Sequence, residues 1–201
     1  MTHREQKLLK IQTSLFQNDG VSSQLADEFA RQWQAQNPQG QVITRDLGAE
    51  PVPHLDLARF QSFITPEEES TAEQKAVVNY SDQLIAEITS ADVLVLGIPM
   101  YNFSVPSTLR AYFDHVARAG VTFRYTPEGP QGLIKGKRAV VFITRGGFHG
   151  EDHSQTAYVR QFLGFLGITD VEVVHAEGLS VSQDAKENSV KTAREKIAEL
   201  V

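Results

Sequence analysis

Short runs of β-branched and other apolar residues recur along the chain, and each is followed by a segment with helical spacing. The runs cover residues 7–12, 41–47, 92–97, 138–144 and 171–175. The segments near residues 22–36, from Ser70 onward, and over 107–119, 155–167 and 184–200 carry apolar residues three or four positions apart. This alternation predicts an α/β fold with a parallel sheet covered by helices on both faces.

Local signals predict where several helices begin and end. Ser70 and Glu73 have the spacing of a capping box, so we expect a helix to begin at Ser70. Gly167 predicts the end of helix 155–167, and residues 182–184 predict a cap for the last helix.

Two long segments carry no such signal. Residues 48–66 contain three prolines, and residues 120–137 contain four glycines and two prolines. We therefore expect a long connecting loop and an irregular excursion. Loops of that length are uncommon unless they are functional, and these two are candidates for the walls of a substrate pocket.

Five strands alternating with five helices fit two architectures. One is the doubly wound flavodoxin-like sheet with strand order 2-1-3-4-5, and the other is half of a Rossmann domain. In either case ligands bind beyond the carboxyl ends of the strands. The loops after the first, third and fourth strands are therefore the places to look for chemistry.

The loop after the first strand, residues 13–23, is rich in hydroxyl groups. Its sequence, TSLFQNDGVSS, contains neither GxGxxG nor GxxxxGK[ST], so the usual glycine-rich nucleotide cradles are absent. Hydroxyls at Thr13, Ser14, Ser22 and Ser23 beside a helix N-terminus suit a single phosphate group. On this loop alone, a capping role for Ser22 or Ser23 is the simpler interpretation, since serine is a leading cap residue.

The loop after the third strand, residues 99–107, reads PMYNFSVPS. Tyr101 and Phe103 could line a flat heteroaromatic ring, and Asn102 could offer its amide to a ring edge or a substrate. A loop folded back onto the core explains the same residues equally well.

The loop after the fourth strand, residues 144–150, reads TRGGFHG. Gly146 and Gly147 allow a close backbone approach, and their N–H groups can donate to a carbonyl or to negative charge on a ring. The three loops together fit a ligand made of one phosphate and a flat ring.

Composition narrows the function further. The 201 residues fit one domain, residues 1–201, and the net charge of −6 opposes binding to nucleic acid. The absence of cysteine excludes disulfides and thiolate catalysis, so redox chemistry would need a cofactor. Residues 1–10 are polar and no apolar run approaches the ~20 residues of a membrane span, so we expect a cytoplasmic protein that is not inserted into a membrane.

Other chemistries lack their motifs. His149 and His153 with the two acids between them could suggest a metal site, but helix-borne spacing such as HExxH is absent and a polar loop is simpler. No GxSxG indicates a serine hydrolase. Phe162 and Phe165 are more typical of core than of an active site.

Several longer segments resemble the FMN-dependent NADH-azoreductases, also described as NADH:quinone oxidoreductases. The most specific are PMYNF at residues 99–103, YFDHVARAGVTFRYT at 112–126, TRGGFH at 144–149 and FLGFLGITDV at 162–171. RDL at 45–47 and PVPHLD at 51–56 support them. The similarity extends over nearly the whole chain.

The resemblance implies a flavodoxin-like fold and a homodimer with two active sites at the interface, each subunit binding one FMN. It also implies the cofactor-binding residues Ser14, Gly20, Val21, Ser22, Met100, Tyr101, Asn102, Phe103, Thr144, Arg145, Gly146 and Gly147. The substrate pocket would involve Asn102, Phe103, Tyr125, His149 and, from the neighbouring subunit, Phe162. Family members often have a second serine where this chain has Gly20, a difference that could weaken FMN affinity.

The implied reaction passes hydride from NADH or NADPH through bound FMN to a quinone or azo compound. Donor and acceptor would occupy the same place in turn, which predicts ping-pong kinetics, with Tyr125, His149 or water as proton donors. Azo cleavage to amines would need two cycles and quinone reduction one. Arg59 is a weak candidate for a contact to the 2′-phosphate of NADPH. The alternative from another class is a flavodoxin-like electron carrier or flavin-binding regulatory module without turnover.

Overall fold

A five-stranded parallel sheet forms the centre of the molecule. The computed structural model describes residues 5–201; residues 1–4 of the polar N-terminal segment lie outside that range. The strands are β1 (Lys7–Gln12), β2 (Gln41–Asp46), β3 (Val93–Pro99), β6 (Arg138–Thr144) and β7 (Asp170–Ala176), in the order β2-β1-β3-β6-β7. The flavodoxin-like order is therefore confirmed, and the half-Rossmann alternative is wrong.

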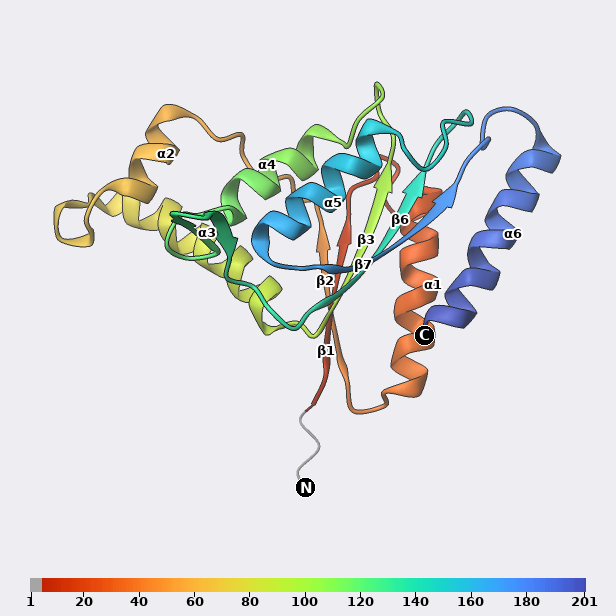
Figure 1. Cartoon of the computed structure of the whole chain (residues 1–201), viewed down its shortest axis with the longest axis horizontal. Coiled ribbons are helices and arrows are strands. Elements are labelled where there is room, and N and C mark those ends of the chain that lie inside the picture. Colours follow the sequence, from red (N-terminus) through yellow and green to blue (C-terminus); the bar gives the residue numbers. More distant parts are fainter. Residues whose placement is uncertain (1–4) are drawn as a thin grey trace.

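Helices cover both faces of this sheet. On one face lie α1 (Val21–Gln36) and α6 (Gln183–Leu200); on the other lie α3 (Ala72–Ser90), α4 (Ser107–Val116) and α5 (Ser154–Leu166) (Figure 1). Alternate residues of β3 enter the two cores, because Val95 packs beneath α1 while Leu94 and Leu96 pack on the other face. The apolar run of β3 is thus explained by burial on both sides.

The segment predicted as a loop over residues 48–66 contains a helix, α2 (Leu57–Ile64). The Asp56 carboxylate caps it by accepting a hydrogen bond of 2.8 Å from the backbone N of Arg59. The prediction was wrong because the flanking prolines hide a helix of only eight residues. In Figure 1, α2 lies at the outer end of the molecule beyond α3, and a 3-10 turn at Glu67–Glu69 follows it.

Residues 120–137 are also more regular than predicted. They form an antiparallel hairpin of β4 (Phe123–Thr126) and β5 (Gly129–Gly132). Its base lies against the carboxyl end of α5, since a Cβ on Gly132 would fall 2.2 Å from the backbone N of Gly167. No residue with a Cβ would fit at this position, so the two backbone segments can pack together only because glycine is present. The glycines that suggested irregularity in fact allow this packing.

The predicted helix ends are confirmed with one shift. The capping box lies at Thr71 and Gln74, one residue after the predicted pair, and α3 begins at Ala72. Gly167 ends α5 with φ of 101°, a conformation that favours glycine. Ser182 caps α6 by accepting from the backbone N of Ala185 at 3.1 Å.

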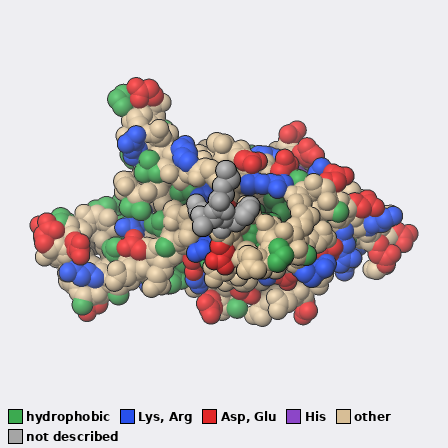
Figure 2. Space-filling model, turned by 90° about the horizontal axis from the view of Figure 1, so that it is seen from below, with side chains coloured by type: hydrophobic (Ala, Val, Ile, Leu, Met, Phe, Trp, Pro, Cys, Tyr) green, Lys and Arg blue, Asp and Glu red, His purple; other side chains and the backbone are tan. Residues whose placement is uncertain are grey.

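Acidic and basic side chains are interspersed over the surface seen from the side where the strands begin (Figure 2). Among residues 5–201, no helix combines the length and apolar character needed to cross a bilayer.

Candidate functional site

A hollow of about 240 Å³ lies at the carboxyl ends of β1, β3 and β6, where the three predicted loops meet. This is the edge at which parallel sheets bind ligands. Of the residues implied as cofactor contacts, the hollow is lined by Ser14, Gly20, Val21, Ser22, Met100, Tyr101, Thr144, Arg145 and Gly146. Asn102, Phe103 and Gly147 do not line it; Asn102 and Gly147 directly follow lining residues, and Phe103 comes one position later.

The first turn of α1 borders the hollow with unused hydrogen-bond donors. Gly20 is the N-cap residue and supplies no side-chain cap; its own N–H donates to the Gln17 carbonyl at 3.2 Å after a 3-10 turn at Gln17–Asp19. The N–H groups of Val21, Ser22 and Ser23 have no acceptor within residues 5–201, as expected for an uncapped helix start. A dianion at this position would satisfy them.

The serine hydroxyls of this turn are not helix caps. The Oγ atoms of Ser22 and Ser23 are buried and have no hydrogen-bond partner among residues 5–201. Ser22 lines the hollow and Ser23 does not. The capping interpretation is therefore wrong, and Ser22 fits a phosphate because a buried hydroxyl normally has a partner.

Glycines bring this turn close to the strands. A Cβ on Gly97 of β3 would fall 2.7 Å from the Ser22 carbonyl oxygen, so the strand and the helix start touch through backbone atoms. A Cβ on Gly20 would fall 2.2 Å from the Ser14 Oγ, which itself accepts from the backbone N of Phe16 at 3.1 Å. Position 20 therefore has no room for a side chain while Ser14 keeps this rotamer.

The loop after β3 is a tight turn with strained backbone. Tyr101 and Ser104 exchange two backbone hydrogen bonds of 3.0 Å, and the residues between them, Asn102 and Phe103, have φ of 48° and 63°. Positive φ at both central positions is typical of a type I′ turn, in which glycine is usual and phenylalanine is rare. Phe103 is nevertheless 70% exposed, so the idea that its ring folds back onto the core is wrong.

A hydrogen bond ties this turn to the first loop. The Tyr101 hydroxyl accepts from the backbone N of Leu15 at 3.1 Å. The ring of Tyr101 is thereby held at the border between the two loops, where it lines the hollow.

The glycine turn after β6 presents backbone donors. The carbonyls of Gly146 and Gly147 accept from Ser180 and Gly178 at 2.9 and 3.0 Å, while their own N–H groups donate to no acceptor within residues 5–201. Leu179 and Ser180, which precede α6, also line the hollow. These two residues were missed by the sequence analysis; their only signal is their place after the last strand, which lies beside β6 in the sheet.

Arg145 reaches the hollow through its position in the chain, but its guanidinium is engaged elsewhere. The residue is 1% exposed, and the guanidinium donates to Glu177, Gln155, Thr156 and the Gly150 carbonyl. Only the backbone of Arg145 is left to contact a ligand.

His149 lies next to the exposed ring of Phe103. Their ring centroids are 6.1 Å apart in an edge-on arrangement, and His149 is 5.1 Å from the ring of His153. Burial lowers the pKa of His153 below its ordinary value, with the nearby charge of Arg145 acting in the same direction. Among the residues described, no group of three or more His, Asp or Glu could hold a metal ion.

Tyr125 and Phe162 lie away from the hollow of their own chain. Tyr125 is 76% exposed on the hairpin, which meets the carboxyl end of α5. That helix begins near the site, and its 13 residues carry the chain about 20 Å away from it. Phe162 stacks on Phe113 of α4 with centroids 3.8 Å apart. Neither ring lines the hollow formed by this chain.

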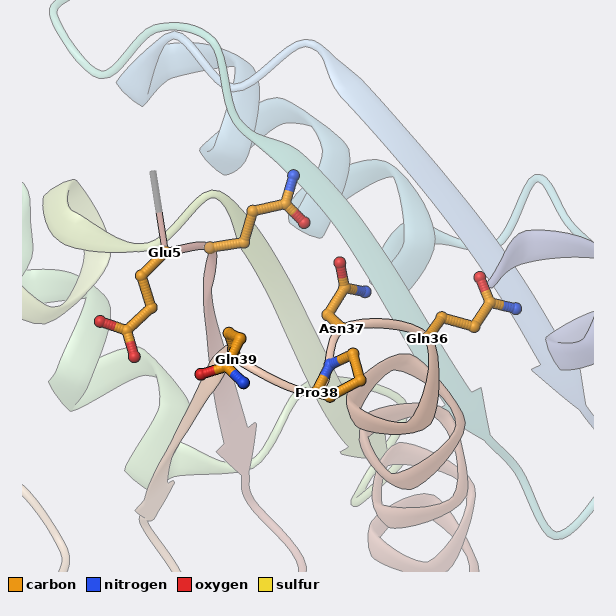
Figure 3. A pocket seen from close by; sticks show the side chains of 7 residues that line it. Glu5, Gln36, Asn37, Pro38 and Gln39 are labelled. Carbon is orange, nitrogen blue, oxygen red and sulfur yellow. The ribbon is translucent and has the colours of Figure 1, made fainter. Parts of the chain in front are cut away.

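A second hollow, of about 580 Å³, lies at the opposite edge of the sheet between β1 and the end of α1. Figure 3 shows that its polar side chains do not converge, since Glu5 and Gln36 point in different directions. Because these side chains do not converge on one point, we assign no ligand to this hollow.

Comparisons with known proteins agree with this geometry. Residues 6–201 match a family model described as having the flavodoxin-like fold. A protein of Cellvibrio japonicus named FMN-dependent NADH:quinone oxidoreductase is 50% identical over 196 residues, which are 96% of this chain and 98% of that protein. A Pseudomonas putida protein named FMN-dependent NADH:quinone oxidoreductase 2 is 48% identical over 195 residues, with 96% and 98% covered.

Solved structures are also similar. The azoreductase from Bacillus anthracis str. Sterne superposes with a TM-score of 0.87 at 30% identity, covering 97% of this chain and 98% of the other. An FMN-dependent NADH-azoreductase from Bacillus anthracis str. Ames Ancestor, in complex with FMN, gives a TM-score of 0.86 at 26% identity, covering 97% and 99%. The chain therefore belongs to the flavodoxin-like family, among the FMN-dependent NADH:quinone oxidoreductases.

Proposed function

We propose that this chain is an FMN-dependent oxidoreductase that passes hydride from NADH or NADPH to quinones and azo compounds. The observation that carries the proposal is the start of α1 beside the hollow, where the buried Ser22 hydroxyl and three backbone N–H groups have no partner among residues 5–201. These groups suit one phosphate dianion, and the loop that carries them lacks the glycine-rich motif of a dinucleotide site. The names of the relatives support FMN as the molecule that carries this phosphate.

Each loop has a distinct role toward the cofactor. The N–H groups of residues 21–23 and the Ser22 hydroxyl would hold the phosphate, and Tyr101, which lines the same hollow, would contact the flavin ring. The N–H groups of Gly146 and Gly147 donate to the polar edge of the ring, where they stabilise negative charge. FMN, when bound, supplies the hydride-transfer chemistry, and no side-chain nucleophile is needed.

Donor and acceptor bind in turn over the exposed side of the site. The Phe103 ring supplies an apolar surface for flat substrates, and the neighbouring His149 can deliver a proton, as can Tyr125 of a second subunit. Quinone reduction takes one cycle. Cleavage of an azo bond to two amines takes four electrons and therefore two cycles.

We also propose a homodimer, because the resemblance assigns Tyr125 and Phe162 to a substrate pocket and both lie outside the hollow of their own chain. A cytoplasmic location accords with the absence of cysteine. A single domain accords with a central five-stranded sheet whose strands are drawn from residues 7–176.

The test uses the purified chain mixed with FMN and passed through gel filtration. We expect a yellow species that coelutes with the protein and that oxidises NADH when a quinone is added. With both substrates varied, double-reciprocal initial-rate lines should be parallel; converging lines would contradict a shared site. FMN binding without NADH oxidation would favour an electron carrier, and a colourless folded protein would contradict the proposal.

A further inference from the structure

The loop that carries the flavin-edge donors is held from beneath by a buried ion pair. The guanidinium of Arg145 donates to Glu177 Oε1 at 2.7 Å, to the Gly150 carbonyl at 2.7 Å and to Gln155 Oε1 at 3.0 Å. The Arg145 side chain is completely buried, and that of Glu177 is 16% exposed. Arg145 thus connects the end of β6, the start of α5 and the loop after β7.

The Glu177 carboxylate fastens the other end of the same turn. Its Oε1 accepts from the backbone N of His149 and its Oε2 from that of Gly150, both at 3.2 Å. These bonds and that from Arg145 hold the pKa of Glu177 below its ordinary value despite its burial. The carboxylate is therefore ionised at neutral pH and accepts from both sides of the turn at once.

The residues after Glu177 continue the attachment. The N–H groups of Gly178, Leu179 and Ser180 donate to the carbonyls of Gly147, Arg145 and Gly146. Every carbonyl of residues 145–147 is thereby engaged, and the N–H groups of Gly146 and Gly147 are left as donors.

The network also reaches the loop after β3. The Gln155 amide, whose oxygen accepts from Arg145, donates to the Pro99 carbonyl at 3.2 Å. The donors at the ring edge and the turn along the ring therefore share one buried support.

We propose that Glu177 is a positioning residue, which through Arg145 and the His149–Gly150 amides sets the conformation of the glycine turn at the flavin edge. This inference rests on the proposed FMN function. A buried ion pair is often replaceable by apolar residues without loss of stability, so its value here is in fixing one loop conformation. Glu177 itself does not line the hollow, so its effect must pass through the turn.

The test compares two isosteric substitutions. Glu177→Gln removes the charge and replaces one acceptor by a donor that faces Arg145 or a backbone N–H. The matched control is Glu87→Gln, because Glu87 pairs with Arg45 at nearly the same burial, 20% exposed against 16%, and no residue of that pair lines the hollow. The measurements are amide hydrogen exchange of residues 146–150 in the FMN-free protein and the FMN dissociation constant from fluorescence titration.

We expect Glu177→Gln to increase exchange at His149 and Gly150 at least tenfold and to weaken FMN binding at least tenfold, with Glu87→Gln leaving both unchanged. Glu177→Asp keeps the charge on a shorter side chain and should recover part of the exchange protection and part of the FMN affinity. It replaces Glu177→Gln in the test if the glutamine variant does not fold. Unchanged exchange and affinity in Glu177→Gln, or equal losses in Glu87→Gln, would overturn the inference. A wild-type chain that binds no FMN would instead overturn the proposed function, while the exchange measurement would still judge the support of the turn.

Discussion

The hydroxyl groups of Ser22 and Ser23, at the start of α1, are both in an unfavourable environment. Both are buried without a hydrogen-bond partner among the described residues, yet only Ser22 borders the hollow. A buried unpaired hydroxyl costs free energy in the ligand-free protein, and a phosphate can recover that cost only at Ser22. The pair therefore offers an internal comparison between ligand binding and simple burial.

Replacing Ser22 by alanine should separate these effects. We expect Ser22→Ala to weaken FMN binding by roughly tenfold or more, since a hydrogen bond to a charged group contributes about 1.5–3 kcal/mol. The thermal stability of the FMN-free protein should stay the same or rise, because an unsatisfied polar group is removed. Ser23→Ala is the control and should leave the FMN dissociation constant unchanged; equal losses in both variants would exclude a specific role for Ser22.

The Phe103 backbone is a second local conflict that points to function. A side chain at φ of 63° is strained, and the ring gains little from burial because it is 70% exposed. We expect Phe103→Gly to stabilise the protein by about 1 kcal/mol, the order of the penalty for an L-residue in the left-handed region. The kcat/KM for a quinone should fall by contrast, since the apolar surface is lost. Phe103→Ala keeps the strain and should lose activity without the gain in melting temperature.

Among the contacts between elements, the one between β3 and α1 positions the helix start that borders the hollow. Gly97→Ala would place a methyl group 2.7 Å from the Ser22 carbonyl, so the helix start must move away from the strand. We expect a loss of about 1–3 kcal/mol in the free energy of unfolding, as for other overpacked cores, together with weaker FMN binding. Gly164→Ala on α5 is the control, because a Cβ there meets nothing within 4 Å. A Gly97→Ala protein with normal stability would mean that this close approach is not required.

The packing of α2 on α4 introduces a pH dependence. His115 of α4 is fully buried with its ring edge-on to Phe63 and Tyr80; its Nδ1 lies 2.9 Å from the Ala111 carbonyl and its Nε2 has no partner within residues 5–201. Burial lowers its pKa below 6.5, assisted by the charge of Arg59, while Asp114 and Asp56 act in the opposite direction.

The direction in which stability changes with pH depends on whether the folded or the unfolded state binds the proton first. Above pH 6.5 the histidine is neutral in both states; as the pH falls, the unfolded chain is protonated before the folded one, so stability decreases. We expect the wild type to lose more of its free energy of unfolding between pH 7.5 and 5.5 than His115→Leu does, measured by urea unfolding at the two pH values. Other histidines contribute to both proteins alike, so identical losses would show that His115 does not titrate in this range.

At the scale of the whole molecule, two rings that the resemblance assigns to the substrate pocket lie far from the hollow of their own chain. Sedimentation should therefore give a species of twice the 22.3 kDa chain mass. Mixing two variants of reduced activity, Ser22→Asp and Tyr125→Ala, should raise the activity above the mean of the two if a hybrid dimer contains one intact site. A fully active monomer would contradict the assembly.

Much of the architecture was accessible from periodicity alone. The continuous apolar run of β3 and the spacing of Leu25, Phe29 and Trp33 predict a doubly buried strand and a core-facing helix, and both are confirmed. The helix α2 and the hairpin β4–β5 were missed, because prolines and glycines obscure short elements whose stability comes from packing against α3, α4 and α5.

Hydrophobic spacing and loop composition are local properties, so they were enough to predict the layered α/β fold and the three loops at the carboxyl edge of the sheet. Three features came only from the folded chain: the Ser22 hydroxyl is buried without a partner among residues 5–201 instead of capping the helix, the Arg145 side chain supports the glycine turn from below, and Gly20 is constrained by Ser14. These depend on contacts between residues far apart in the chain or on the rotamer of a single side chain, and neither is encoded in a pattern of spacing.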